Sequence, residues 1–399
     1  MAFKVSNSVT WVGKIDWELR KFHGEELSTH RGTSYNSYLV RGSEKTVLID
    51  TVWQPFAKEF VKKLKEEIDL KDIDYVVANH AEIDHSGALP ELMREIPDTP
   101  IYCSKAGVKS LKGHYHEDWD FNPVQTGDKL NLGDKELVFV EAKMLHWPDS
   151  MFCYLTGENI LFPNDAFGQH YASELMYNDL VDQAELYEEA IKYYANILTP
   201  FSKLVSAKIK EVVDMNLPVE KICPSHGIIW REDPLQIVNK YAEWADSYQE
   251  NQVTIVYDTM WDGTRRAAEA IAEGIKEAND SIAIKLFNTG RSDTNDVITE
   301  IFKAKAIVVG SPTINKGILH SIAALMEMIK GLKFQNKKGA AFGCYGWSGE
   351  SVKLLNEQLE EAGFELLNND GLKMLWNPDN EAIAAAVNLG KEIGAALNK

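Results

Sequence analysis

Four side chains that can bind metal ions fall within the six residues from 80 to 85: His80, Glu82, Asp84 and His85. Metal sites need deprotonated ligands that converge from different directions, and this spacing can supply two neighbouring ions at once. The run 75–78 indicates a short buried strand, and 88–92 indicates the start of a helix. The cluster is therefore expected in a strand-to-helix loop at a sheet edge, where α/β enzymes carry their chemistry. A solvated polar loop is the alternative.

Three further candidate ligands follow later predicted strands: His146 follows 136–140, Asp165 follows 159–162, and His226 ends the strand that starts at 221. Alone, each could equally be a hydrogen-bonded polar residue. Together with the first cluster they repeat one pattern four times, a strand with a ligand at its carboxyl end. Asp165 is placed to be a bridging carboxylate. Trp147 and Pro148 follow His146 directly, so they fix the backbone and wall the site with an aromatic ring.

Composition limits the classes of protein to which the chain can belong. Its 399 residues exceed the size at which one hydrophobic core keeps growing, so two domains are expected. There is no apolar run that could cross a bilayer and no signal-peptide pattern, so a cytoplasmic protein without a membrane partner is expected. The net charge of -18 argues against nucleic-acid binding. The four cysteines are scattered and form no Cys-x-x-Cys pair, which argues against a rubredoxin-like module on this chain.

Residues 1–250 are expected to form the first domain. Its first fifty residues alternate like an antiparallel meander over 9–13, 35–40 and 46–50. Asp50 ends the last of these strands, where it could orient a metal-bound group or serve as a helix cap or turn residue. Taken alone, His23 is a loop histidine with a structural or solvated role. His114 and His116 are expected at the surface, beside the acidic run 117–120.

Residues 251–399 are expected to form the second domain, after a polar linker over 248–252. Strand and helix patterns alternate there, beginning with a buried strand over 253–257 and a helix over 265–278. This alternation predicts a doubly wound parallel sheet of about flavodoxin size.

Three loops at predicted strand ends of this domain suit a flavin. The first brings hydroxyls and backbone N–H groups to a helix N-terminus as a phosphate cradle, and the other two would enclose an isoalloxazine ring with Trp347 as a stacking plane. Asp262 stands where flavodoxins usually have Gly, so its carboxylate should weaken phosphate binding unless it points outward. A domain without flavin is the alternative. The residues of the three loops are Thr259, Met260, Trp261, Asp262, Gly263 and Thr264; Ser311, Pro312, Thr313, Ile314 and Asn315; and Tyr345, Gly346, Trp347, Ser348 and Gly349.

The ligand pattern resembles that of the metallo-β-lactamase superfamily, a sandwich of two β-sheets flanked by helices. The signature of that superfamily is His-x-His-x-Asp-His followed by a distant His, Asp and His. Here Glu82 replaces the second histidine, and a hard anionic oxygen in place of an imidazole nitrogen favours iron over zinc. That substitution marks the flavodiiron proteins. The chain resembles one from end to end, with an αββα sandwich followed by a flavodoxin-like doubly wound sheet.

The resemblance implies two non-haem iron ions and one flavin mononucleotide (FMN). One iron would be held by His80, Glu82, His146 and the bridging Asp165, and the other by Asp84, His85, His226 and the same Asp165. In some members of the family the residue at the position of His85 does not ligate directly.

The activity implied by the resemblance is the reduction of dioxygen to water or of nitric oxide to nitrous oxide. Both gases would use the same ligands, so the sequence does not set the preference. Tyr193 and His23 match a tyrosine and a loop histidine that line the pocket as proton donors in the family, and His170 is expected behind the ligands. Members assemble as head-to-tail homodimers or dimers of dimers, and a rubredoxin-like or other small redox protein would supply the electrons.

Two other readings remain open. One is a zinc metallohydrolase of the glyoxalase II type with an accessory flavodoxin domain, against which Glu82 argues. The other is an electron carrier whose first domain is an inactive scaffold, against which the seven filled ligand positions argue.

Overall fold

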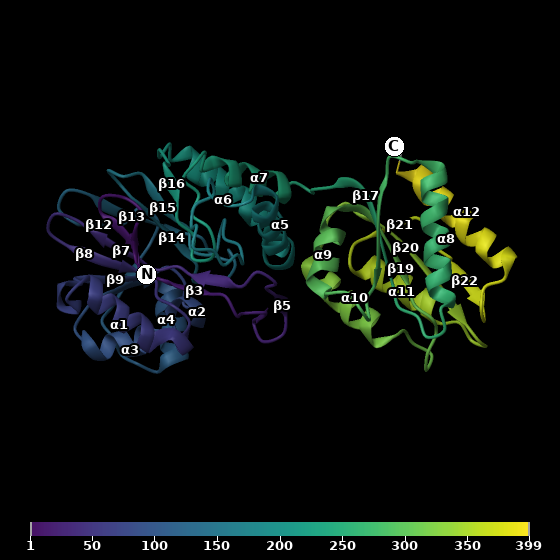
Figure 1. Cartoon of the computed structure of the whole chain (residues 1–399), viewed down its shortest axis with the longest axis horizontal. Helices are drawn as coiled ribbons and strands as arrows, with labels where there is room; N and C mark the ends of the chain where they lie inside the picture. The colour runs from purple at the N-terminus through teal and green to yellow at the C-terminus, as the bar shows by residue number, and fades with distance from the viewer. Residues whose placement is uncertain (1, 398–399) are drawn as a thin grey trace. The chain divides into compact units, whose positions relative to one another are not determined.

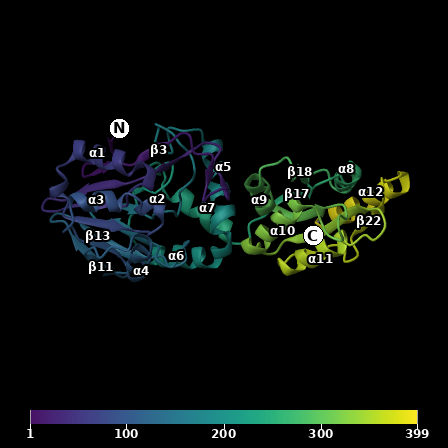
Figure 2. The same cartoon turned by 90° about the horizontal axis from the view of Figure 1, so that it is seen from below.

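The computed structural model describes residues 2–397, which form two compact units (Figures 1 and 2). The first unit contains the chain up to Tyr194 together with Phe201–Ala242, and the second contains Ala195–Pro200 together with the residues from Glu243 onwards. Each unit encloses its own cluster of buried apolar side chains. Within the described range, no helix is both long enough and apolar enough to span a bilayer.

The larger of the two main sheets of the first unit has seven strands in the order β1-β2-β7-β8-β9-β10-β11. The pairs from β1 to β8 are antiparallel, as the predicted meander requires, and the pairs from β8 to β11 are parallel. The strands are β1 (Phe3–Lys4), β2 (Val9–Trp11), β7 (Tyr38–Arg41), β8 (Thr46–Ile49), β9 (Tyr75–Ala78), β10 (Ile101–Ser104) and β11 (Phe121–Val124).

The smaller main sheet has five strands in the order β12-β13-β14-β15-β16 and is antiparallel except for the parallel pair of β15 and β16. Its strands are β12 (Lys129–Asn131), β13 (Glu136–Glu141), β14 (Met151–Leu155), β15 (Ile160–Phe162) and β16 (Lys221–Ile222). Two short antiparallel pairs lie apart from both sheets: β3 (Lys14–Asp16) with β6 (Thr33–Tyr35), and β4 (Lys21–Phe22) with β5 (Leu27–Ser28).

The two main sheets pack against each other through one apolar core. Val40, Ile49 and Val77 of the larger sheet share a buried cluster with Phe139 and Phe162 of the smaller sheet. Every residue of β14 is buried because this central strand is covered on both faces. Helices α1, α3 and α4 lie outside one sheet and α5, α6 and α7 outside the other (Figure 1). This arrangement confirms the predicted αββα sandwich.

The helices that accompany these sheets are α1 (Ala57–Glu67), α2 (Ile83–Ser86), α3 (Leu89–Glu95), α4 (Lys105–Tyr115), α5 (Gln183–Tyr193), α6 (Ser202–Asp214) and α7 (Leu235–Ala245). Short 3-10 turns occupy Gln54–Phe56, Leu70–Asp72 and Thr199–Phe201, and a π-helical turn occupies Tyr194–Leu198. The helix ends follow ordinary capping chemistry. Ser104, for example, begins α4 because its hydroxyl accepts a hydrogen bond from the N–H group of Gly107 at 3.0 Å.

The second unit is a parallel sheet in the order β18-β17-β19-β20-β21, with β22 also paired to β20. Helices α8 and α12 cover one face, and α9, α10 and α11 cover the other (Figures 1 and 2). This confirms the doubly wound, flavodoxin-like sheet. Its strands are β17 (Glu250–Tyr257), β18 (Ala283–Asn288), β19 (Ala304–Gly310), β20 (Lys338–Tyr345), β21 (Glu365–Leu366) and β22 (Leu372–Leu375). Its helices are α8 (Gly263–Ala278), α9 (Thr294–Lys303), α10 (His320–Leu332), α11 (Ser351–Glu361) and α12 (Asn380–Ala396).

Strand β17 begins inside the stretch predicted to be a linker. Glu250 and Asn251 are exposed, but Gln252 is buried and its amide donates to the carbonyl oxygen of Glu300 at 2.9 Å. The first residues of β17 are polar because they lie beyond the apolar core. Their polarity is why the sequence pattern did not predict a strand there.

Helices α8 and α12 approach so closely that both need glycine at their contact. A Cβ atom on Gly274 would lie 1.9 Å from the carbonyl oxygen of Val387, and one on Gly390 would lie 2.1 Å from the carbonyl oxygen of Ile271. Both added atoms would meet backbone, which cannot turn aside as a flexible side chain can. The two helices are therefore held together by direct backbone contact.

Gly274→Ala should push these helices apart and lower the free energy of unfolding by about 1–3 kcal/mol, the usual cost of overpacking. Gly331 in α10 is the matched control, because a Cβ atom there meets nothing within 4 Å. Gly331→Ala should leave stability unchanged or raise it by up to about 1 kcal/mol, since alanine favours helices. Urea unfolding followed by circular dichroism measures both variants. Equal stabilities would contradict the close contact.

Candidate functional site

The candidate metal ligands lie at the carboxyl ends of strands in both sheets of the first unit. The parallel strands β8 and β9 lead into Asp50 and Asn79, and α2 after β9 carries Asp84 and His85. The parallel strands β15 and β16 lead into the loops that carry Asp165 and the last histidine. Because the carboxyl ends of neighbouring parallel strands share one edge, these loops meet.

Asp50 ties three of the loops together. Its Oδ1 accepts a hydrogen bond from the backbone N–H group of Asn79 at 2.7 Å. Its Oδ2 accepts from the side chains of Asn79 at 3.2 Å, Asn164 at 3.4 Å and Ser225 at 3.4 Å. Each of these three residues directly precedes a candidate ligand. Burial raises the pKa of Asp50, and the hydrogen-bond donors around it oppose that shift. Asp50 therefore orients the loops that carry the ligands. From the sequence, two roles were open for it: orienting a metal-bound group, or serving as a helix cap or turn residue.

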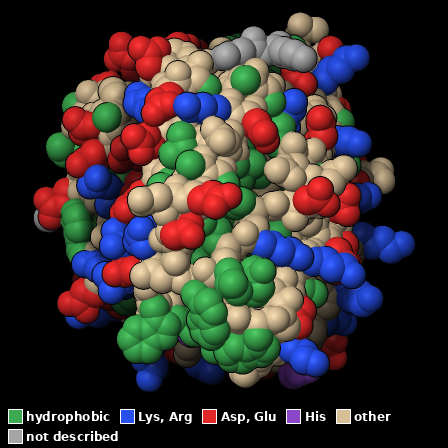
Figure 3. Space-filling view, turned by 90° about the vertical axis from the view of Figure 1, so that its right-hand side faces the viewer, with side chains coloured by type: hydrophobic (Ala, Val, Ile, Leu, Met, Phe, Trp, Pro, Cys, Tyr) green, Lys and Arg blue, Asp and Glu red, His purple; other side chains and the backbone are tan. Residues whose placement is uncertain are grey.

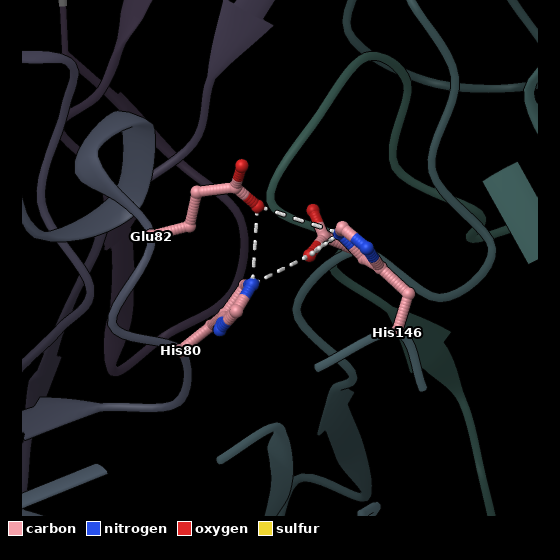
Figure 4. A group of neighbouring side chains, drawn as sticks. His80, Glu82 and His146 are labelled. Atoms are coloured by element: carbon pink, nitrogen blue, oxygen red, sulfur yellow. Dashed lines mark hydrogen bonds and ion pairs between the residues drawn. The ribbon is translucent and has the colours of Figure 1, made fainter. Parts of the chain in front are cut away.

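Two sets of ligand atoms lie close together, each within 4.8 Å: His80, Glu82, His146 and Asp165 in one set, and Asp84, His85 and His226 in the other. In the first set, Oε2 of Glu82 lies 3.2 Å from Nε2 of His80 and 3.4 Å from Nε2 of His146 (Figure 4). In the second set, Oδ2 of Asp84 lies 3.0 Å from Nε2 of His226 and 3.2 Å from Nε2 of His85.

Asp165 turns a different oxygen toward each set. Its Oδ1 lies 3.0 Å from Nε2 of His85 and 3.4 Å from Nε2 of His226. Its Oδ2 lies 3.5 Å from Nε2 of His146 and 3.8 Å from Nε2 of His80. A carboxylate in this position can bridge two metal ions, one in each set.

Two of the histidines are oriented by partners that the sequence analysis did not single out. Nδ1 of His80 lies 2.9 Å from Oδ2 of Asp149, and Nδ1 of His226 lies 2.8 Å from the carbonyl oxygen of Ser34. A carbonyl oxygen can only accept, so Nδ1 of His226 carries the proton and Nε2 keeps its lone pair for a metal. Asp149 could have been found from its place three residues after His146. The Ser34 contact uses backbone, for which side-chain type gives no signal.

The ligand atoms fit metal ions because several of them are buried and have no hydrogen-bond partner. Both carboxylate oxygens of Asp84, Oδ2 of Asp165 and Nε2 of His85 have no hydrogen-bond partner among residues 2–397. The contacts of His85 with the two carboxylates are at ion-pair distance without hydrogen-bond geometry. Buried polar atoms of this kind cost free energy unless a cation or a donor completes them.

Opposite charges shift the pKa values of the metal-free site. Burial lowers the pKa of His85 and His146, but the surrounding carboxylates outweigh burial and raise both to about 9. Burial raises the pKa of Glu82 and Asp165, yet the imidazoles around them bring both well below the ordinary range. The site is thus a set of charges that compensate one another.

The predicted proton donors, His23 and Tyr193, and His170, which was expected behind the ligands, all lie around these ligands. Nε2 of His23 is 2.9 Å from Oε1 of Glu82. The ring centroid of His170 is 5.1 Å from that of His226 and 5.1 Å from that of Tyr193. Burial lowers the pKa of His170 and raises the pKa of Tyr193, so both are neutral near pH 7. Their part in proton transfer stays a prediction.

A cavity of about 430 Å³ opens at the strand ends of the second unit. Apolar side chains stand exposed on its rim, with Trp261 at 88%, Trp347 at 86% and Trp376 at 62% exposure. Figure 3 shows one face of this unit, with apolar side chains gathered low on that face. The cavity is lined by Thr259, Met260, Trp261, Gly263, Thr264, Pro312, Thr313, Cys344, Tyr345, Gly346, Trp347, Trp376 and Asn377.

Six of the residues predicted to bind flavin do not line this cavity: Asp262, Ser311, Ile314, Asn315, Ser348 and Gly349. The hydroxyl of Ser311 donates to the carbonyl oxygen of Pro312 and accepts from the N–H group of Leu319. Oδ1 of Asp262 accepts from Nε of Arg265 at 3.0 Å, and this carboxylate is 63% exposed, so it points outward. Their contact with a flavin stays a prediction.

The sequence analysis missed two of the lining residues. Trp376 and Asn377 follow β22, a strand end that no hydroxyl or glycine pattern marked as a ligand loop. Cys344, which stands directly before Tyr345 of the third predicted loop, is buried and also lines the cavity.

Together, the fold and these sites define a class: a β-lactamase-like domain with two adjoining ligand sets, joined to a flavodoxin-like domain. Residues 33–227 match the family described as ODP family beta lactamase, and residues 255–390 match Flavodoxin. The chain is 54% identical to the anaerobic nitric oxide reductase flavorubredoxin of Klebsiella pneumoniae, over 98% of this chain and 81% of that protein.

Two solved structures are similar over both domains. The rubredoxin oxygen:oxidoreductase of Desulfovibrio gigas is 38% identical, with a TM-score of 0.96 and coverage of 100% of this chain and 99% of that chain. The flavodiiron protein of Giardia intestinalis is 31% identical, with a TM-score of 0.95 and coverage of 100% and 97%. The chain belongs to the flavodiiron proteins.

Asp50→Ala should lower the free energy of unfolding by about 1–3 kcal/mol, because it leaves the buried N–H group of Asn79 without an acceptor. The freed loops should also retain less metal. Asp128→Ala is the control, since Asp128 accepts from the backbone of Gln125 at an exposed turn where water can replace it. Thermal unfolding and metal analysis of the purified variants measure both effects. An Asp50→Ala protein as stable and as metal-rich as the control would contradict the role assigned to Asp50.

The raised pKa values of His85 and His146 predict how the stability of the metal-free chain changes with pH. Their pKa values rise from 6.5 to about 9, so the folded state holds these protons more tightly than the unfolded state. This stabilisation is complete below pH 6.5 and is lost as the pH rises through about 9. The melting temperature of metal-free protein should therefore fall across that range. Metal-loaded protein should lack this fall, because bound histidines carry no proton at Nε2. Parallel profiles for both forms would contradict the prediction.

Proposed function

We propose that this chain reduces nitric oxide to nitrous oxide, and dioxygen to water, at a pair of iron ions that are supplied with electrons through FMN. The observation that carries the proposal is the pair of ligand sets that share Asp165, with Glu82 at a position where zinc enzymes of this fold place histidine. The names of the relatives agree with both substrates, since one is a nitric oxide reductase and another an oxygen oxidoreductase. The higher identity to the first favours nitric oxide.

The first set would hold one iron and the second set the other, with Asp165 between them. Bound iron would supply a redox-active site that gives electrons to the gas. The chain itself fixes where this happens. Asp149 and Ser34 hold two of the imidazoles with Nε2 toward the site, and the imidazoles around Glu82 and Asp165 keep these carboxylates ionised despite their burial.

The cavity of the second unit would hold FMN, whose ring accepts electrons singly or in pairs and passes them on. Oγ1 of Thr264, in the first turn of α8, is buried and has no hydrogen-bond partner among residues 2–397. A phosphate at this helix N-terminus would satisfy it. Trp347 offers a plane for the isoalloxazine ring. The outward carboxylate of Asp262 leaves the cradle without an opposing charge.

His23, His170 and Tyr193 would deliver the protons that both reductions consume. Tyr193 is buried and uncharged, so its phenol can donate where charge builds up beside the ligands. His23 contacts Glu82 and is one-third exposed, so it connects the ligands to solvent.

Two partners complete the proposal. A rubredoxin-like or other small redox protein would reduce the flavin. Electron tunnelling falls steeply with distance, so each flavin must lie close to a metal pair. We propose a head-to-tail homodimer in which the flavin of one copy serves the metals of the other. A monomeric mass for fully active protein in sedimentation experiments would exclude this assembly.

The decisive experiment combines metal and flavin analysis with anaerobic reduction and separate addition of each gas. We expect about two irons and one FMN per chain and rapid reoxidation by nitric oxide, with dioxygen tested in parallel. A reduced, iron-loaded protein that reacts with neither gas would refute the proposal. The zinc hydrolase is not favoured, because the relatives that cover both domains are named as reductases or oxidoreductases. Zinc together with thioesterase activity would restore it.

Tyr193→Phe removes one hydroxyl and keeps the ring beside His170. If that phenol is a proton donor, turnover of at least one gas should fall by about 10²-fold or more, as for the loss of a general acid. Tyr187→Phe is the control, since Tyr187 lies on the same helix and its hydroxyl donates to Gln236 away from the ligands. Turnover measured at equal iron and FMN content separates chemistry from loading. Unchanged turnover with both gases would exclude Tyr193 as a donor.

A further inference from the structure

A chain of aromatic rings leads from the metal ligands of the first unit toward its surface. The ring of Trp147 meets the ring of His80 edge-on, with centroids 5.1 Å apart. On its other side, His114 is stacked at 6.3 Å, and Tyr115 follows at 6.0 Å from His114. Trp119 lies 5.6 Å from Tyr115 and is partly exposed to solvent. The sequence analysis had placed His114 simply at the surface.

The order of these rings suits the movement of an electron toward the metal site. Indole loses one electron more readily than most side chains do. The rate of electron tunnelling falls steeply with distance, so tunnelling between aromatic rings in contact is fast. Trp147 and Trp119 are the oxidisable ends of the path. His114 and Tyr115 bridge them, and Tyr115 is held in place by its hydroxyl, 2.7 Å from Oγ of Ser86.

The outer end of the path lies among negative charges. Glu117, Asp118 and Asp120 flank Trp119 in the sequence and are exposed. Lys112 pairs with Asp118 at 2.7 Å, which leaves the other two carboxylates to act on the indole. Negative charge nearby stabilises a positively charged ring, so these carboxylates favour a missing electron at Trp119.

A second branch reaches the ligands but lacks this feature. Tyr35 lies 6.0 Å from His226, and Trp53 lies 6.0 Å from Tyr35. The two residues on either side of Trp53 in the sequence carry no charge, and the carboxylate of Asp16 lies at the inner ring, where it accepts a hydrogen bond from the hydroxyl of Tyr35 at 3.4 Å. Of the two branches, the one through Trp147 is therefore the one in which negative charges at the outer end favour an oxidising equivalent near the surface.

We propose that the rings from Trp147 to Trp119 form an escape route for oxidising equivalents, which protects the metal ligands. The proposal rests on the proposed reduction of dioxygen and adds a second activity to it. When dioxygen reacts at a site that holds fewer electrons than full reduction needs, the site takes one electron from Trp147. Trp147 takes one electron from Trp119, and the N–H proton of Trp119 passes to water.

The surface reductant is a small thiol. It returns a hydrogen atom to the Trp119 radical and becomes a thiyl radical, and two thiyl radicals combine to one disulfide. Two thiols thus provide two electrons and two protons for each pair of escaped oxidising equivalents. The indole is regenerated when thiol is present and is consumed only when thiol is absent.

The test uses the iron- and FMN-loaded protein, reduced with too few electrons, mixed with dioxygen and frozen. Electron paramagnetic resonance should show an indole radical in the wild type and a strongly reduced signal in Trp119→Phe. After repeated turnover without thiol, peptide mass analysis should find oxygen added at Trp119 in the wild type. Trp17→Phe is the control, because Trp17 is an indole of 51% exposure that lies outside the path.

With ample electrons, Trp119→Phe should consume dioxygen at the initial rate of the wild type, but it should lose activity severalfold faster under electron shortage. Dithiothreitol should lengthen the life of the wild type and not that of the variant. An identical radical in Trp119→Phe, or oxidation at Trp53 in place of Trp119, would overturn the escape route and leave the proposed function intact. A wild type that does not consume dioxygen at all would overturn the dioxygen branch of that function and the route with it.

Discussion

A single buried carboxylate sets the geometry on which the metal site depends. Asp50 accepts hydrogen bonds from Asn79, Asn164 and Ser225, which stand before ligands contributed by both sheets. A carboxylate has about four acceptor positions, so one side chain can hold three loops in register. The ligands converge because their backbones are fixed relative to Asp50. The cost of burying this charge is offset by the donors that surround it.

The same principle of compensation extends to the ligands themselves. Carboxylates and imidazoles alternate around Asp165, so in the metal-free chain each buried charge faces an opposite one. This arrangement lets the site form during folding without a cation, while the unpartnered oxygens of Asp84 keep the preference for one. The cavity of the second unit handles charge differently, since the carboxylate of Asp262, at the start of α8, is turned to Arg265.

The sequence predicted the doubly wound sheet and the positions of the candidate ligands at strand ends from local periodicity, and it predicted the αββα sandwich from the resemblance of the ligand pattern to a known family. It could not predict partners that arrive from distant loops. Ser34 acts through its carbonyl oxygen, and Trp376 reaches the cavity of the second unit from a strand end without a recognisable motif. The start of β17 was missed for a related reason: its first residues are polar, and their partners lie in the distant strands β18 and β19 and, for Gln252, at Glu300 of α9.

The backbone contact between α8 and α12 has a consequence for how the second unit forms. Gly274 and Gly390 are separated by more than two thirds of the sequence of that unit, yet they meet directly. Contacts of such long sequence separation require most of the chain to be ordered before they contribute, which slows folding. During synthesis, the face of the sheet that α12 covers therefore stays partly exposed to solvent until that helix leaves the ribosome.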